Sequence, residues 1–298
     1  MSGPGVERPT VAIMAPGDMG HTVGGVLVAN GLRVITCLVG RSARTRGLAE
    51  KAGIEPVADD AALIHEANLL LSILVPAQAF QLARRIADAL ERTPSSLVYV
   101  DCNAVAPQTA RRIGELVEAS GASFVDAGII GPPPKPGART VIYASGANVN
   151  ALSPLRDHGL DIREVSARPG DASALKMCYA AMTKGTTAVM SELAIAADRL
   201  GIAGALHEEL AQSQSAAAAR MERAVPDMVP KAHRWVGEME EIAKTFEHCG
   251  LTPDIFLGAA ALYGMVADTP LGKTDQEAWR GKDRSLEDVI KLLAAREH

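Results

Sequence analysis

The chain has 298 residues, of which 48% are hydrophobic and 22% charged, so a well-buried globular protein of two domains is expected. The net charge of −5 and the lack of any basic run longer than a dipeptide give no sign of a nucleic-acid or membrane-surface partner. No apolar stretch in the sequence approaches the ~20 residues of a membrane span.

The N-terminal segment and the cysteines of the chain indicate a reducing compartment. The N-terminal segment 1–9 is polar and rich in Pro and Gly, without the apolar core of a signal peptide. The four cysteines are far apart and form no C-x-x-C pair, and three of them sit within apolar stretches that favour buried free thiols. They are Cys37, Cys102, Cys178 and Cys249. We therefore expect a soluble, cytoplasmic protein.

From residue 10 to about residue 166, short apolar runs alternate with amphipathic segments. Such alternation is typical of βαβ units and of a parallel sheet that helices cover on both faces. The sequence therefore predicts an α/β fold, with a doubly wound Rossmann domain over residues 1–168. A Pro-rich segment, Gly131–Gly137, is predicted to form a rigid loop. The expected strands are Val11–Ala15, Val34–Val39, Leu69–Val75, Leu97–Val100, Phe124–Val125 and Val141–Ala144.

The first apolar run leads into a glycine-rich turn, APGDMG, followed by a predicted helix from His21 to Asn30. This is G-x-G-x-x-G with Ala in the first place, and its glycines allow backbone to approach a pyrophosphate at the helix N-terminus. The alternative is a glycine-rich turn that binds nothing. We predict that the turn binds a dinucleotide through Pro16, Gly17, Asp18, Met19 and Gly20.

The end of the second predicted strand indicates whether the dinucleotide is NAD or NADP. An NAD site usually ends this strand with Asp or Glu, which bonds the ribose 2′-hydroxyl and repels a 2′-phosphate. Here no acidic residue occurs from Arg33 through Ala49. Guanidinium and hydroxyl groups at Arg41, Ser42 and Arg44 suit a phosphate. NADP is therefore predicted, NAD stays possible, and the alternative is a solvated basic turn.

After residue 168 the pattern becomes helical, and residues 169–298 are predicted to form an all-helical substrate and dimerisation domain. Asp171 is expected to cap a helix that runs to about Leu200 and spans ~45 Å. Gly185 is its weak point. Further helices are predicted at Gly204–Ala224, Lys231–Cys249, Pro253–Ala267 and Ser285–Arg296, with Pro226, Pro230 and Pro253 as breakers.

These motifs resemble those of the β-hydroxyacid dehydrogenase family, which includes 3-hydroxyisobutyrate dehydrogenase and is related to 6-phosphogluconate dehydrogenase. The resemblance covers nearly the whole chain and is strongest in the first 200 residues. It implies that Val75 and Pro76 run beside the cofactor ribose, and that Lys176 is the catalytic lysine. The matching segments are Gly17–Gly20, Arg41–Ser42, Val75–Pro76, Asp101–Pro107, Phe124–Gly131 and Gly170–Met177.

Other positions depart from the family pattern. Asn103 and Ala104 replace the Ser-Thr pair that usually holds a substrate carboxylate, so the resemblance does not extend to a carboxylate substrate. Asn103 still follows the fifth strand at the ligand-binding edge of a doubly wound sheet. We expect Asn103 to contact substrate or the nicotinamide ribose, and Gly131 to contact substrate. In the C-terminal domain, Glu238 stands near the place where the family has a Lys-Asp pair.

Lys176 is also the best acid/base candidate on chemical grounds. It lies one turn into the long helix among apolar neighbours, where desolvation would lower its pKa and let a neutral amine take a hydroxyl proton. The alternative is a lysine that extends from the helix to water. Tyr179 and Thr183 are candidate substrate contacts. Helical spacing places Lys176, Ala180, Thr183 and Thr187 on one face, which lines either a cleft or a helix–helix contact.

The sequence thus predicts an NADP-dependent oxidoreductase that transfers a hydride between the nicotinamide and a small hydroxy or carbonyl compound. An imine reductase and a non-catalytic NADP-sensing protein are the alternatives. No histidine has metal-ligand spacing, so no catalytic metal is expected. A homodimer is expected, partly from the resemblance.

Overall fold

The structure is a computed structural model that describes residues 8–274, 278–279 and 284–295. Residues 1–7, in which no signal peptide is expected, and Arg296, where the last predicted helix ends, lie outside the described residues. The chain forms two compact units, residues 1–177 and 178–298. Their boundary falls inside a helix, nine residues beyond the division expected from the sequence.

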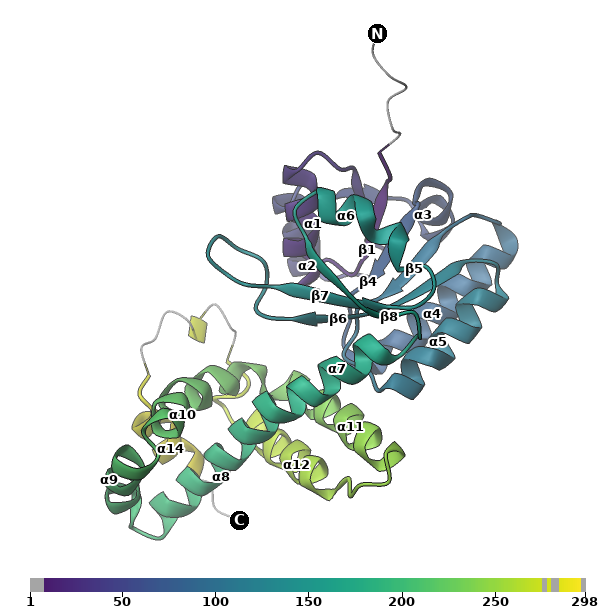
Figure 1. The fold of residues 1–298 in the computed structure, drawn as a ribbon. Helices are drawn as coiled ribbons and strands as arrows, with labels where there is room; N and C mark the ends of the chain where they lie inside the picture. The colour runs from purple at the N-terminus through teal and green to yellow at the C-terminus, as the bar shows by residue number, and fades with distance from the viewer. Residues whose placement is uncertain (1–7, 275–277, 280–283, 296–298) are drawn as a thin grey trace. The chain divides into compact units, whose positions relative to one another are not determined.

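The first unit is built on a sheet whose strands follow the order β3-β2-β1-β4-β5-β6-β7-β8 (Figure 1). Neighbouring strands run parallel except β6 and β7, which are antiparallel. The predicted doubly wound α/β architecture is confirmed. The strands are β1 (Val11–Met14), β2 (Val34–Cys37), β3 (Glu55–Val57), β4 (Leu69–Ser72), β5 (Val98–Asp101), β6 (Ser123–Ile130), β7 (Val141–Ser145) and β8 (Asp161–Ser166).

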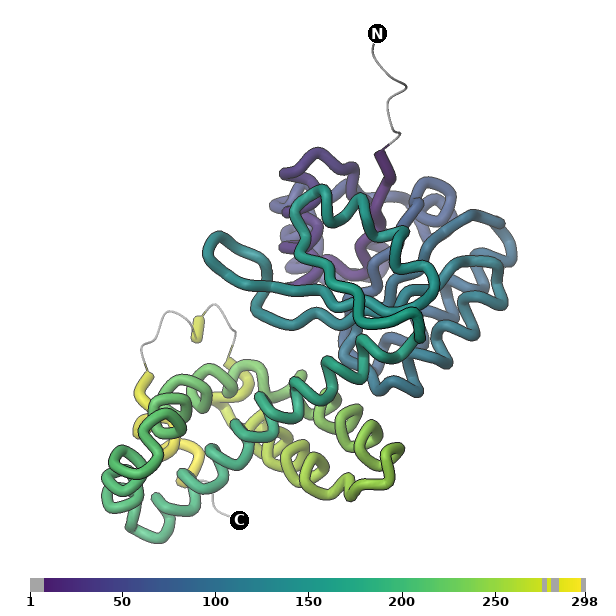
Figure 2. Tube along the Cα trace, viewed as in Figure 1, coloured from purple at the N-terminus to yellow at the C-terminus, as the bar shows by residue number. Residues whose placement is uncertain are grey.

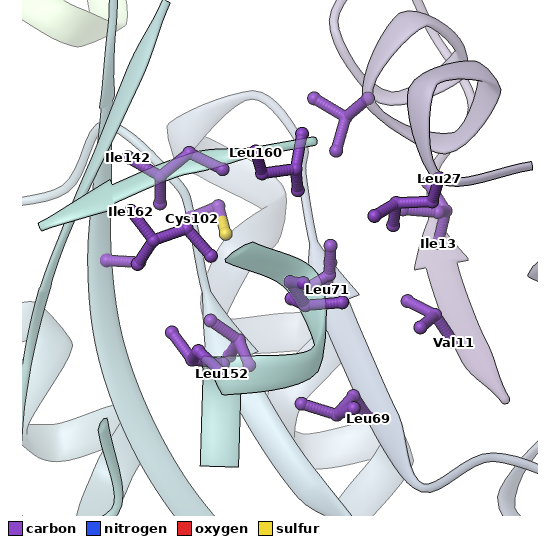
Figure 3. Close-up of a cluster of buried hydrophobic side chains, with 14 of the residues drawn as sticks. Val11, Ile13, Leu27, Leu69, Leu71, Cys102, Ile142, Leu152, Leu160 and Ile162 are labelled. Carbon is purple, nitrogen blue, oxygen red and sulfur yellow. The ribbon is translucent and has the colours of Figure 1, made fainter. Parts of the chain in front are cut away.

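Helices cover both faces of this sheet, and alternate side chains of each strand build two separate cores. One core joins the strands to α1 and α6 (Figure 3). The other joins them to α3, α4 and α5. Both faces of β1 and β4 are buried, which explains their unbroken apolar sequences. The helices are α1 (Gly20–Ala29), α2 (Ala43–Lys51), α3 (Asp60–Glu66), α4 (Pro76–Arg92), α5 (Pro107–Ala119), α6 (Ser153–Asp157) and the start of α7 (Asp171–Ala180).

The two edge strands, β3 and β8, match none of the apolar runs from which strands were predicted. The β3 sequence is EPV and its side chains are largely exposed. The β8 sequence is DIREVS, in which one side chain is fully buried. An edge strand carries polar and charged side chains because one of its sides faces water. Its sequence therefore lacks the hydrophobic signal of a central strand.

The second unit is helical over its described residues, as predicted. Its first helix continues α7 without a break, through a π-helical turn at Ala181–Gly185 and then α8 (Thr186–Arg199). Gly185, the predicted weak point, ends that turn. The other helices are α9 (Ala203–Ser213), α10 (Ser215–Met228), α11 (Ala232–His248), α12 (Asp254–Asp268) and α14 (Leu286–Ala294).

Two sequence expectations for this unit are wrong. The stretch predicted as one helix over Gly204–Ala224 contains two helices, because the backbone of Gln214 leaves helical geometry between them. Pro226 does not end the second of these, since it lies within the last turn of α10. A proline there removes one backbone hydrogen bond without stopping the helix.

The four cysteines also differ from expectation. Cys37 and Cys102 are buried, whereas Cys178 and Cys249 are exposed, so fewer thiols are buried than the three predicted. Among the described helices, none is both long and apolar enough to cross a membrane.

Candidate active site

The turn between β1 and α1 is shaped by one glycine and left open by another. A Cβ on Gly20 would collide with the carbonyl oxygen of Ala15, so the fold itself requires glycine there. A Cβ on Gly17 would meet no atom within 4 Å. No side chain caps the N-terminus of α1, and its first turn contains no acidic residue. The turn therefore offers backbone N–H groups and open space to an anion, as a dinucleotide pyrophosphate requires.

The difference between the two glycines leads to a paired prediction. Gly17→Ala is expected to leave stability within about 0.5 kcal/mol of wild type but to weaken NADPH binding about tenfold or more, because the methyl group occupies the open space. Gly20→Ala is expected to destabilise the protein by about 1–3 kcal/mol through overpacking. Urea unfolding and NADPH fluorescence titration measure the two effects. Unchanged NADPH affinity in Gly17→Ala would show that the turn does not approach the cofactor.

The segment after β2 gathers positive charge. Gly40, with φ +69°, turns the chain so that Arg41 is half-buried and Ser42 caps α2 by accepting a hydrogen bond from Thr45 N at 3.2 Å. Burial, followed by the nearby charge of Arg85 on α4, lowers the pKa of Arg41. A guanidinium whose charge is disfavoured by burial and by a neighbouring positive charge gains from binding a phosphate.

Arg44 forms an ion pair within the protein. Its Nη2 lies 2.5 Å from Oδ1 of Asp18, so an ion pair links α2 to the glycine-rich turn. The pair could not be predicted because its two residues are 26 positions apart and lie in different elements. Arg44 therefore contacts the turn itself.

A row of buried polar residues crosses the sheet near the carboxyl ends of its strands. Strand register places Ser72, Asp101, Asp126 and Ser145 next to one another on β4, β5, β6 and β7. Each of these side chains is at most 1% exposed. Cross-strand neighbours lie on the same face, so the carboxyl groups of Asp101 and Asp126 are adjacent. Motifs were recognised around Asp101 and Asp126, but the sequence shows no sign that the four residues form one row.

Asn103 is bound inside this network. Its Oδ1 accepts a hydrogen bond from Leu74 N at 2.5 Å, and its Nδ2 donates to Ser72 Oγ at 2.8 Å and to Asp101 Oδ1. The residue is only 2% exposed. These bonds hold the turn before Val75 and Pro76, which gives Asn103 a positioning role, and its contact with a ligand stays a prediction. Val75 is 40% exposed and Pro76 begins α4.

The carboxylate of Asp126 anchors the N-terminus of α7. Its Oδ2 accepts hydrogen bonds from Gly170 N and Ser173 N, both at 3.0 Å, and from Ser145 Oγ at 2.8 Å. Its Oδ1 accepts from Ser173 Oγ at 2.5 Å. Burial raises the pKa of Asp126, and these donors oppose that effect. A residue on β6 thus satisfies the first N–H groups of the helix that carries the candidate catalytic lysine.

Asp171 was predicted to cap this helix, and that prediction is wrong. Asp171 is the first helical residue, and its Oδ2 accepts from Ser166 Oγ at 2.7 Å and from Arg168 Nε at 3.2 Å. These hydrogen bonds lower the pKa of Asp171. Its side chain faces the preceding loop because the buried Asp126 already occupies the end of the helix.

Lys176 lies over β6. A Cβ on Gly128 would come within 3.0 Å of Lys176 Cβ and 3.4 Å of its Cδ, so glycine at this position makes room for the lysine side chain. Gly128 follows Asp126 by two residues and shares its face of the sheet. Lys176 is half-buried, and its charge lowers the pKa of Asp101. The lysine, the helix anchor and the polar row therefore meet at one place in the first unit.

The Pro-rich loop lines a cavity that Lys176 does not line. It joins β6 to β7, and Figure 2 shows it as an extended hairpin. Gly131 has φ +122°, and a Cβ there would collide with the carbonyl oxygen of Arg139, so the loop requires this glycine. Loop residues 134–136 and 138–140 line a cavity of about 730 Å³ together with α1 residues such as Thr22 and Val26. The loop therefore faces the first helix of the dinucleotide-binding fold.

Tyr179 and Thr183 belong to the second unit. Tyr179 is 51% exposed, whereas the Thr183 hydroxyl donates to the carbonyl oxygens of Tyr179 at 3.1 Å and Ala180 at 3.4 Å. The π-helical turn changes the number of residues per turn after Ala180, so the helical face predicted to continue through Thr183 and Thr187 is interrupted there.

Side chains of the second unit hold this π-helical turn. Arg220 Nη2 donates to the Thr183 carbonyl at 3.1 Å, and Tyr263 donates its hydroxyl proton to the Lys184 carbonyl at 2.5 Å. Lys184 also forms an ion pair with Glu238. Glu238, noted in the sequence for its position, thus contacts the turn. Among the described residues, no group of three or more His, Cys, Asp or Glu side chains is placed to hold a metal ion.

Each half of the chain contains a segment that matches a protein-family model. Residues 10–156 match the model of the NAD binding domain of 6-phosphogluconate dehydrogenase, and residues 197–266 match the domain of unknown function DUF1932. An uncharacterized 28.5 kDa protein in the 7S RNA 5′ region of Methanothermus fervidus is 30% identical over 183 residues, which are 61% of this chain and 69% of that protein.

Two solved structures extend the similarity to the second unit. A conserved protein of unknown function, described as structurally similar to 3-hydroxyacid dehydrogenases, is 28% identical with a TM-score of 0.66, covering 87% of this chain and 97% of that one. Mycobacterium tuberculosis 3-hydroxyisobutyrate dehydrogenase, solved with L-serine, has a TM-score of 0.71 at 19% identity, covering 97% of this chain and 100% of the other. At that identity the likeness concerns the fold.

Proposed function

The chain belongs to the family of oxidoreductases that carry the NAD-binding domain of 6-phosphogluconate dehydrogenase, and we propose that it uses NADP to interconvert a small hydroxy compound and its carbonyl form. The observation that carries this proposal is the placement of Lys176. Lys176 is half-buried and its aliphatic chain lies over Gly128 of β6, on a helix whose first turn is fixed by the buried Asp126. Such a group is positioned to exchange a proton with a substrate.

The residues of the glycine-rich turn fit a dinucleotide. Gly17 leaves space where backbone can approach a pyrophosphate, and the uncapped N-terminus of α1 stabilises negative charge. Arg41 and Ser42 would hold the 2′-phosphate, and Val75 with Pro76 would border the ribose. A bound nicotinamide supplies the acceptor or donor of the hydride. The second unit matches a domain of unknown function, so it does not narrow the substrate.

The role of Lys176 follows from its two protonation states. As a neutral amine it accepts the proton of the substrate hydroxyl during oxidation. As an ammonium it donates that proton to the oxygen during carbonyl reduction. Asn103 and Ala104 are 2% and 7% exposed, so the loop that carries a Ser-Thr pair in the family presents little polar surface here. We therefore favour substrates that do not depend on a carboxylate contact at this loop.

The test is NADPH oxidation by the purified protein against aldehydes, β-keto acids and cyclic imines. Turnover of a carbonyl compound that depends on Lys176 would support the proposal. Turnover of imines alone, independent of Lys176, would replace it with imine reduction. NADPH binding without turnover of any compound would favour a cofactor-sensing protein.

Cofactor preference provides a separate prediction. Arg41→Ala is expected to raise the KM for NADP by about 10- to 100-fold, because it removes charge-assisted hydrogen bonds to the 2′-phosphate. The KM for NAD, which lacks this phosphate, is expected to change less than about threefold. Arg44→Ala is the comparison, because Arg44 pairs with Asp18 of the shared pyrophosphate turn and should affect both cofactors alike. Equal effects of Arg41→Ala on NADP and NAD would contradict the assignment.

A further inference from the structure

Two buried carboxyl groups lie side by side in the polar row of the first unit. Asp101 on β5 is 1% exposed and its register partner Asp126 on β6 is 0% exposed. Neighbouring strands are about 4.8 Å apart, and in-register side chains share a face. Two ionised carboxylates so close together in a buried place repel each other strongly, so one of them holds a proton more readily than the other.

The hydrogen bonds show which carboxyl group takes the negative charge. Three donors converge on Oδ2 of Asp126, from Gly170 N, Ser173 N and Ser145 Oγ. Donors in this number stabilise an ionised oxygen. Asp101 Oδ1 accepts from Asn103, whereas Asp101 Oδ2 is buried and has no hydrogen-bond partner among the described residues. A negative charge on a buried oxygen without a hydrogen-bond donor is unfavourable. Of the two carboxyl groups, Asp101 is therefore the one that holds a proton more readily.

Other groups act on Asp101 as well. The pKa of Asp101 is raised to about 7 by the combined effect of its surroundings. Burial raises it most, the Asn103 hydrogen bonds lower it, the neighbouring Asp126 raises it and Lys176 on α7 lowers it. Tyr99 lies on the same strand as Asp101, and Cys102 follows that strand. Burial, and then the negative charge of Asp101, raise the pKa of both groups. Both are therefore neutral near pH 7. Among the causes that shift the pKa of Asp101, Lys176 supplies the positive charge.

We propose that Asp101 is a positioning residue for Lys176, in that its ionisation sets the balance between the ammonium and amine forms of the lysine. This inference rests on the proposed role of Lys176 as acid/base. The coupling is reciprocal, because a cation that favours ionised Asp101 is itself favoured by that ionised carboxylate. When Lys176 takes a proton from a substrate hydroxyl, the new ammonium favours loss of the Asp101 proton to solvent.

The kinetic test compares pH profiles of Asp101→Asn and Ser72→Ala. Carbonyl reduction needs the ammonium form of Lys176. Without the Asp101 charge the ammonium loses its proton at lower pH, so the alkaline limb of kcat is expected about one pH unit lower in Asp101→Asn. Ser72→Ala alters the same network without removing an ionisable group and should leave the limb in place. An unmoved limb in Asp101→Asn would overturn the proposal, as would an equal shift in Ser72→Ala.

A second readout requires no activity. Infrared spectra of the free protein should show the carbonyl band of a protonated carboxylic acid that titrates near pH 7, and Asp101→Asn should lack it. Lys176→Met removes the charge that favours ionised Asp101, so the midpoint should rise. A missing band in wild type, or an unmoved midpoint in Lys176→Met, would overturn the coupling even if a substrate is found. If no carbonyl compound is turned over, a shifted midpoint still supports the coupling while the proposed function fails.

Discussion

Replacing Lys176 with methionine is expected to lower kcat for a carbonyl substrate by about 10³-fold, within the 10²–10⁴ range of a general acid/base. Methionine has a similar length and can occupy the space over Gly128, but it cannot hold or release a proton. The KM for NADPH should stay within about threefold of wild type, because the glycine-rich turn and Arg41 are unchanged. Steady-state kinetics over the substrate panel measure both quantities.

Two further variants show whether the loss of activity comes from lost proton exchange, from the lost positive charge or from replacement of a lysine in general. Lys176→Arg keeps a positive charge but does not give up its proton at accessible pH, so oxidation of the hydroxy compound should be lost in this variant too. Lys51→Met changes an exposed lysine in the last turn of α2 and should keep the full rate. If Lys176→Met retained more than a tenth of the wild-type kcat, another group would be the acid/base.

Replacing Asp126 with alanine is expected to lower the free energy of unfolding by about 3–5 kcal/mol, the cost of removing one partner from a buried charged network. Gly170 N, Ser173 N and the Ser145 hydroxyl would lose their shared acceptor. The first turn of α7 would then lose its fixed position, so kcat should fall as well. Urea unfolding at pH 7 measures the stability change.

Asp171→Ala is the matched control, since the sequence alone favours Asp171 as the cap. Its partner Arg168 is 84% exposed, and exposed pairs of this kind contribute at most about 1 kcal/mol. Ser145→Ala, which removes one donor to Asp126 and the acceptor of Ala172 N, should cost about 1–3 kcal/mol. A larger loss in Asp171→Ala than in Asp126→Ala would show that the helix depends on the local residue.

The features that the sequence predicted well are local ones. The central strands β1 and β4 carry unbroken apolar runs because both faces are buried, and the glycine-rich turn is set by residues within six positions of one another. The edge strands β3 and β8 were not predicted, because water on one side of an edge strand permits charged side chains.

The features that the sequence missed depend on distant partners. The cap of α7 comes from Asp126, so the nearby Asp171 was chosen in its place. The hydrogen bonds of the Asn103 amide to Leu74, Ser72 and Asp101 could not be predicted, because two of these partners lie about 30 residues earlier in the chain. The π-helical turn rests on Arg220 and Tyr263, which no helical periodicity around residue 183 can reveal.

The Asp126 anchor also bears on the order in which the chain folds. The backbone donors bound to its carboxylate, Gly170 and Ser173, come 44 and 47 residues later, after β7 and β8. Such distant partners meet only after the intervening chain has closed into the sheet, and the entropy of that loop closure opposes early formation. The start of α7 therefore becomes ordered late. A folding intermediate that has β1 to β5 in place but lacks the last strands would already have its glycine-rich turn, while its Lys176 would still be unplaced.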